Sequence, residues 1–147
     1  MSKIDKSEIA DEYLEQGIEC FLDQKRYASA LHLAGAAQDI NESLIKSDRQ
    51  QDFQRVVVDY FEKTLPQTSD VNFDKNEFLK KERNARNAVK HMDGSKDRYI
   101  SINLESEAFS ALNNALMNSL FLHKKETENI KRFKAYVQSN ASKYIER

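Results

Sequence analysis

Apolar side chains recur every three to four residues along nearly the whole chain, and this spacing is the period of an amphipathic α-helix. Three capping boxes, in which two side chains satisfy the first free N–H groups of a helix, mark helix starts. They are Asp5-x-x-Glu8, Ser47-x-x-Gln50 and Asp74-x-x-Glu77. The pattern predicts six helical segments, near residues 5–22, 27–44, 47–65, 74–92, 106–123 and 126–144.

Residues that break helices are few in this chain. Its 147 residues include three Gly and one Pro, which argues against an all-β fold and against long flexible linkers. Pro66 ends the third predicted segment, and Asp93-Gly94-Ser95 ends the fourth. We therefore expect an all-α fold, a compact bundle of five to six helices that forms a single domain over residues 1–147.

One stretch departs from the helical spacing. Tyr99-Ile-Ser-Ile-Asn-Leu104 alternates apolar and polar side chains for six residues, which is the period of a strand. The stretch is too short and too isolated to found a sheet. We expect a short extended piece between two helices.

The cellular setting follows from what the sequence lacks. No run approaches the roughly 20 apolar residues of a membrane span, and the polar, acidic N-terminus has no secretory core. The lone Cys20 cannot form an internal disulfide. We expect a cytoplasmic protein without a membrane partner.

Charge is unevenly distributed along a chain whose net charge is −1. Residues 5–24 hold seven acids and one Lys, whereas residues 78–92 hold five basic residues and one Glu. Residues 123–147 hold seven basic residues and three Glu. The acidic segment and the two basic segments can pair within the fold or with a partner, and two basic faces on one side would attract a polyanion.

Residues 82–91 carry the residue types most suited to chemistry. Arg86 is a permanent cation whose planar fork of donors can clamp a phosphate, and His91 can exchange a proton near neutral pH. Asn87 lies four residues before His91, on the same helix face. A cation, an amide and a proton carrier suit phosphodiester cleavage without a metal. The alternative is a solvated basic helix face, which is common in charged helices.

Helix geometry refines this interpretation. At about 100° per residue, Phe78, Ala85, Val89 and Met92 form a narrow stripe that should face the core, while Arg86 and His91 fall outside it. These two residues lie about 140° apart around the helix and roughly 7.5 Å apart along it. One copy of the motif therefore makes a loose site. A tight site would need a second helix or a second subunit opposite it.

Several classes of site find no support in the sequence. The three His residues are scattered, and no Cys/His or His/carboxylate spacing suggests a closed metal site. The chain contains neither a glycine-rich phosphate loop nor a Gly-x-Ser-x-Gly motif. We therefore expect no metal and no cofactor.

Two stretches resemble the HEPN superfamily. The first is Arg86-Asn-Ala-Val-Lys-His91, which matches a hallmark of Arg, four to six residues and then His, with a polar residue after the Arg. The second is Tyr27-Ala-Ser-Ala-Leu-His-Leu-Ala-Gly-Ala-Ala-Gln-Asp39, which is similar to the Ala-rich second helix of bacterial members. In many relatives this run continues into paired acids. Here Asp39 alone is the candidate for an acidic helper.

The resemblance implies a metal-independent endoribonuclease that acts as a homodimer, in the role of a toxin or a phage-defence effector with an antitoxin or regulatory protein as partner. Arg86, His91 and Asn87 would be catalytic. Arg83, Asn84 and Lys90 would contact RNA phosphates. Other members keep the fold and only bind, so the alternative is a non-catalytic helical dimer that binds nucleotide, RNA or a protein partner.

Overall fold

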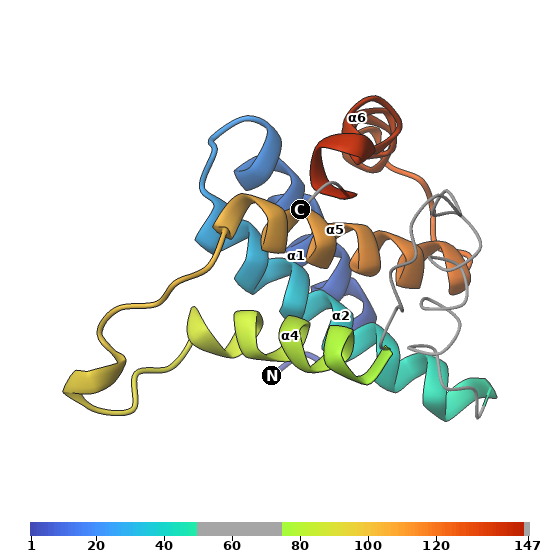
Figure 1. Cartoon of the computed structure of the whole chain (residues 1–147). Coiled ribbons are helices and arrows are strands. Elements are labelled where there is room, and N and C mark those ends of the chain that lie inside the picture. Colours follow the sequence, from blue (N-terminus) through green and yellow to red (C-terminus); the bar gives the residue numbers. More distant parts are fainter. Residues whose placement is uncertain (50–74, 146–147) are drawn as a thin grey trace.

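The computed structural model describes residues 1–49 and 75–145. Over these residues the chain forms five α-helices and a short 3-10 helix, and no strand (Figure 1). They are α1 (Lys6–Leu22), α2 (Tyr27–Arg49), α4 (Lys75–Ala88), η1 (Ser95–Asp97), α5 (Leu104–Phe121) and α6 (Glu128–Ile145). The all-α prediction is confirmed. The predicted helix start at Ser47 is wrong, because α2 continues without a break through Ser47 to Arg49; the rest of the predicted helix near residues 47–65 and its end at Pro66 lie outside the described residues.

Helices α1, α2 and α5 pack against one another and form the centre of the bundle (Figure 1). The chain turns from α1 into α2 at Lys25, whose backbone has a positive φ of 55°. Helix α4 packs against α2 and α5, whereas α6 packs against α1 and α5. Small residues of α2, including Ala30, Ala34 and Ala37, are fully buried and allow the neighbouring helices to approach closely.

Aromatic side chains fill the space between α1, α5 and α6. The ring of Phe133 lies 5.9 Å from that of Phe21 and 6.0 Å from that of Phe109, measured between centroids. Tyr136 lies 5.4 Å from Phe21. We call these four residues the aromatic core. Offset and edge-to-face contacts at such separations add to the free energy gained by burying the rings.

The acidic N-terminal helix pairs within the fold. Lys124 Nζ donates to Asp11 Oδ1 at 2.6 Å, and Arg132 forms an ion pair with Asp23. Asn129, on α6, donates to both Glu15 and Glu19 of α1. Two acids of the N-terminal acidic segment, Asp11 and Asp23, are therefore paired with cations of the C-terminal basic segment.

The apolar stripe expected on α4 is wrong at its C-terminal end. We expected Met92 to face the core, but α4 ends at Ala88 and the side chain of Met92 is 67% exposed. The apolar stripe thus stops at Val89, which packs against the core from the turn that follows the helix. His32, on α2, is exposed because it points away from the buried face of that helix.

Among the described residues, no helix is long and apolar enough to cross a bilayer.

Candidate functional site

Arg86 lies in the last turn of α4 and points across α2. Its Nη1 atom donates to Asp39 Oδ1 at 2.9 Å and, at 3.5 Å, to the backbone carbonyl of Gly35. Only 13% of the side chain is exposed. The structure therefore joins Arg86 to Asp39, the residue singled out in the sequence as the candidate acidic helper.

Gly35 creates the space that Arg86 occupies. A Cβ atom at this position would lie 2.8 Å from Arg86 Cδ, which is closer than two carbon atoms can approach. The missing side chain leaves a groove on α2, and the stem of Arg86 fills it. Glycine within a helix lowers stability by about 1 kcal/mol relative to alanine. The arginine that packs against Gly35 explains why glycine occupies this position.

The burial of Arg86 corrects the expectation that it lies outside the buried face. Its Cα is offset from the apolar stripe, as the helical wheel predicts, but the long side chain bends back onto α2. The aliphatic part of an arginine readily covers apolar surface while its charged end reaches a carboxylate. A helical wheel shows only the direction in which each side chain leaves the helix, not how far a long side chain extends or where it bends.

Two more carboxyl groups lie near Arg86. Burial raises the pKa of Glu82, one turn earlier on α4, to about 7, although the positive charge of Arg86 opposes the shift. Burial likewise raises the pKa of Glu42, on α2. Glu82 accepts a hydrogen bond from Asn114 of α5, and Glu42 accepts one from Gln38 at 2.8 Å.

Sequence reasoning missed both glutamates, although a signal was present. Glu82 precedes Arg86 by four residues and Glu42 follows Asp39 by three, so each pair shares a helix face.

Glu42 and Glu82, together with their neighbours on α2, α4 and α5, form what we call the polar band. Its members are Gln38, Asn41, Glu42, Glu82, Arg86, Asn114 and Asn118. Within the described structure, several buried atoms of this band have no hydrogen-bond partner, among them Arg86 Nε and Asn114 Oδ1.

His91 occupies a different environment from Arg86. It follows α4 in a turn, where its backbone N–H donates to the carbonyl of Asn87 at 3.1 Å, and its side chain is exposed. No hydrogen bond or ion pair joins the imidazole to Arg86 or Asp39 within the described ranges. The structure thus places a buried, paired arginine and an exposed histidine at the same end of one helix.

The other predicted site residues lie on the solvent side of α4 or just beyond it. Asn87, Arg83, Asn84 and Lys90 are all exposed. In the part of the chain described, no group of three or more His, Cys, Asp or Glu residues is arranged to hold a metal ion.

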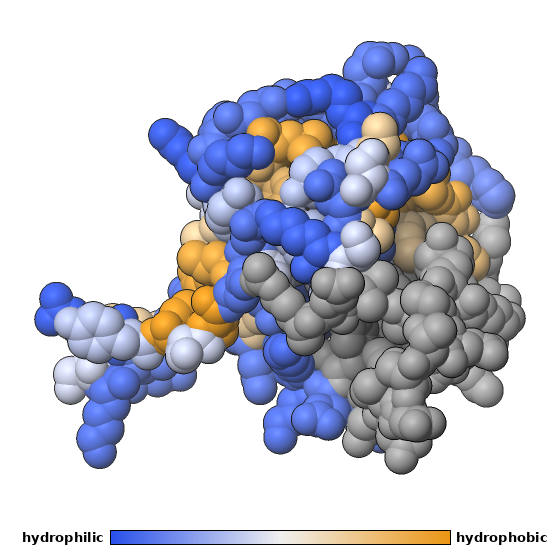
Figure 2. Space-filling view, turned by 45° about the horizontal axis from the view of Figure 1, so that its top comes forward, coloured by the Kyte–Doolittle hydropathy of each residue, from blue (hydrophilic) through white to orange (hydrophobic). Residues whose placement is uncertain are grey.

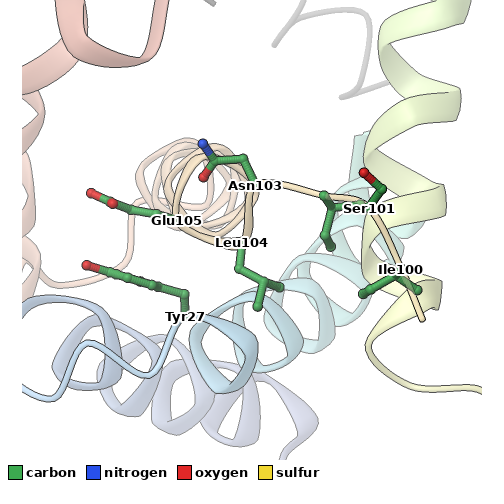
Figure 3. Close-up of a pocket in the computed structure, with 7 residues that line it drawn as sticks. Tyr27, Ile100, Ser101, Asn103, Leu104 and Glu105 are labelled. Atoms are coloured by element: carbon green, nitrogen blue, oxygen red, sulfur yellow. The ribbon is translucent and has the colours of Figure 1, made fainter. Parts of the chain in front are cut away.

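A shallow groove of about 720 Å³ lies at the start of α2, away from the arginine (Figure 3). Tyr27 forms one side of it, and residues 100–105 form the other. Tyr27 is eight residues before Gly35, or roughly 12 Å along the helix, so this groove and the Arg86 environment are separate places.

Comparisons of the chain with protein-family models, with curated proteins and with solved structures find no match.

Proposed function

We propose that this protein is a cytoplasmic, metal-independent endoribonuclease of the HEPN type, and that it acts as a homodimer. The observation that carries the proposal is the pairing of Arg86 with Asp39 at 2.9 Å, at the end of the helix that leads to the exposed His91. Two residues that the resemblance assigns to one site, 47 positions apart in the sequence, are thereby in contact.

The reaction assigns a separate task to each side chain. His91 removes the proton from a ribose 2′-hydroxyl, and the 2′-oxygen attacks the neighbouring phosphorus. The bond from phosphorus to the 5′-oxygen breaks, and this oxygen takes a proton from an imidazolium, which leaves a 2′,3′-cyclic phosphate and a 5′-hydroxyl. Because His91 is exposed, an RNA strand can reach it without rearrangement of the bundle.

Arg86 would stabilise the negative charge that develops on the phosphate. Its contacts with Asp39 and Gly35 both use Nη1, and Nη2 carries two further N–H groups. Asp39 would then hold the guanidinium in one orientation. Asn87 would orient His91, while Arg83, Asn84 and Lys90 would bind flanking phosphates from the exposed face of α4.

The dimer follows from the geometry of one copy. Arg86 and His91 are five residues apart, or about 7.5 Å along a helix, and no contact joins their side chains among the described residues. Two copies that meet at or near α4 would place the His91 of one subunit opposite the Arg86 of the other, so that one site would contain two proton carriers. A toxin or phage-defence role, restrained by an antitoxin or regulatory protein, is the setting that the family resemblance implies.

Cleavage of RNA by the purified protein tests this proposal. We expect cleavage that persists in EDTA and leaves 2′,3′-cyclic phosphate ends. His91→Ala should abolish it without a change in the melting curve, because the side chain is exposed. The matched control is His32→Ala, which removes an exposed histidine of α2 that the proposal does not use. Failure of the wild type to cut RNA at any salt concentration, or full activity in His91→Ala, would refute the enzyme.

The burial of Arg86 favours a second candidate, a non-catalytic helical dimer that binds RNA, nucleotide or a protein partner. In this second candidate, an arginine that is already bound to Asp39 and mostly covered serves only to hold α4 on α2. His91→Lys distinguishes the two, because it keeps a cation but loses a group that exchanges protons near pH 7. For the nuclease, cleavage should collapse while RNA affinity persists. For an RNA-binding module, the wild type should bind with a steep salt dependence and never cut.

A further inference from the structure

Residues 99–103 expose apolar side chains that nothing in the described structure covers. Tyr99 is 83% exposed and Ile100 is 44% exposed, and they follow η1 in a loop that projects from the bundle (Figure 1). Figure 2 shows hydrophobic surface where this projection leaves the body of the protein. Exposed apolar residues that are contiguous in this way mark interaction surfaces more often than isolated ones do.

The backbone of this segment is also unpaired. Among the described residues, the N–H and C=O groups of residues 99–102 take part in no hydrogen bond, and Asn103 has extended angles of φ −88° and ψ 94°. The side chains of Ile100, Ser101 and Leu104 are drawn in Figure 3 along the chain as it enters α5. An extended stretch with free backbone groups is a template for pairing with another strand.

We propose that residues 99–103 of two copies of this chain pair as antiparallel strands centred on Ser101. The sequence Tyr-Ile-Ser-Ile-Asn is nearly symmetric about this serine. In that register Ser101 faces its own copy, and Ile100 lies opposite the partner's Ile102 on one face. A shift by one residue would place isoleucine opposite serine, so the alternation itself selects the register.

A second copy fits this segment better than RNA does. Residues 99–103 carry no charge, whereas Arg98 precedes them and Glu105 follows two residues later. In the register centred on Ser101, Arg98 lies opposite the partner's Leu104 and Glu105 lies opposite the partner's Asp97, so the preference for a second copy rests on the uncharged, nearly symmetric segment and not on its flanking charges. A polyanion would find no cation within the segment and two just before it, Lys96 and Arg98, of which Arg98 already lies 5.5 Å from the centre of the Tyr99 ring.

This inference rests on the homodimer of the proposed function but not on its catalysis. A ladder of five residues is short, and two isolated strands are marginally stable in water. We therefore expect weak association, which a concentration series from roughly 10 to 500 µM should reveal.

Cross-linking tests the register directly. In S101C, the two introduced thiols should face each other, so mild oxidation should give a covalent dimer at least roughly tenfold faster than in a control, because pairing raises the effective concentration. The control is S139C, which places a thiol at an exposed position of α6. The native Cys20 is buried and remains in both variants.

Ser101→Pro tests the backbone pairing, because proline removes the N–H from the ladder. The native N–H makes no hydrogen bond among the described residues, so the monomer should keep its melting temperature. Sedimentation should show twice the 17.1 kDa chain mass for the wild type at high concentration and a single chain for the variant.

Three results would overturn the pairing: a wild type that stays monomeric across the series, a dimeric Ser101→Pro, or equally fast cross-linking of S139C. A monomer that loses RNA affinity on Ser101→Pro would assign the segment to RNA instead and would also overturn it. Cleavage is measured in a separate assay. A silent enzyme that still cross-links through S101C would refute the nuclease and leave the pairing intact.

Discussion

The aromatic core and the polar band hold neighbouring helices together by different means. In the aromatic core, Phe21, Phe109 and Phe133 pack between α1, α5 and α6 and are almost completely buried. In the polar band, ions and amides of α2, α4 and α5 satisfy one another only in part, since Arg86 Nε and other buried atoms lack a partner in the described structure. The first region gains free energy from every contact, whereas the second must offset the cost of removing charges from water.

The difference between the two regions indicates that the aromatic core mainly contributes stability, whereas the polar band contains candidate functional groups. The three buried phenylalanine rings of the aromatic core carry no polar group and only specify the bundle. In the polar band, two carboxyl groups of raised pKa lie beside one arginine, and burying such groups lowers the stability of the fold. Groups with perturbed pKa values cluster at functional sites. The contrast predicts that substitutions in the aromatic core change folding alone, whereas substitutions in the band change folding, pH dependence and activity by smaller amounts.

The largest effect should come from Phe133→Ala. The side chain is completely buried, and its ring contacts Phe21 and Phe109. Its removal leaves a cavity and should lower the free energy of unfolding by about 3–5 kcal/mol in urea denaturation. Tyr99→Ala is the control, because this exposed ring should change stability by less than about 0.5 kcal/mol. Equal losses in the two variants would contradict the description of the core.

The second prediction concerns pH and tests the band. Glu82 has an ordinary pKa of 4.5 when unfolded and a pKa of about 7 in the fold, mainly because of burial. Below pH 4.5 both states hold the proton; between pH 4.5 and 7 the unfolded state loses it first, so stability falls as the pH rises. A shift of this size corresponds to about 3 kcal/mol, fully lost above pH 7.

Glu82→Gln should remove this component, because an amide does not titrate and can still accept the hydrogen bond from Asn114. We expect the variant to be more stable than the wild type at pH 8 and similar to it at pH 4. Urea denaturation at both values measures the difference. A wild type whose stability relative to Glu82→Gln does not change between these pH values would show that Glu82 is not desolvated.

The same two regions explain what the sequence could and could not predict. Helical spacing predicted that Ala85 and Val89 face the core; Ala85 is buried and Val89 packs against the core. This prediction succeeds because an apolar stripe on a helix is removed from water only when it packs against the rest of the protein. The end of α4 was placed too late, since the pattern runs on to Met92 while the helix stops at Ala88.

The candidate site was predicted less completely than the core. The sequence selected Arg86, His91 and Asp39, and the contact between the first and the third could be suggested only by resemblance. Burial of Arg86 depends on the packing angle of α4 on α2 and on Gly35, which spacing along one helix does not contain. The involvement of Glu42 and Glu82 has the same origin, because charged residues on a helix are usually expected to face solvent.

The third prediction removes the cation of the band. Arg86→Met keeps much of the aliphatic stem but removes the positive charge that acts on Glu82 and, together with Lys46, on Glu42. We expect a loss of about 2 kcal/mol, between the values for buried and exposed ion pairs, because Asp39 remains half in water. The pKa of Glu82 should rise further, since Arg86 now lowers it. Arg83→Met, at an exposed position of the same helix, is the matched control for stability.

The smallest effect, and the one that depends most on detailed packing, should come from Gly35→Ala. Alanine favours the helix by about 1 kcal/mol, but its Cβ would lie 2.8 Å from Arg86 Cδ, so the arginine must leave its place or α4 must move. Gly17→Ala is the control: its Cβ would lie 3.2 Å from Leu112 Cδ2, in the apolar interior between α1 and α5.

We expect Gly35→Ala to lower the free energy of unfolding by about 1 kcal/mol and to change the pKa of Glu82, because the distance of Glu82 from the guanidinium changes. At Gly17 the change should affect stability alone and leave the pH dependence as in the wild type. If Gly35→Ala raises stability and leaves the pH dependence unchanged, Arg86 does not depend on the glycine groove, and the band is looser than the contacts of Arg86 with Asp39 and Gly35 indicate.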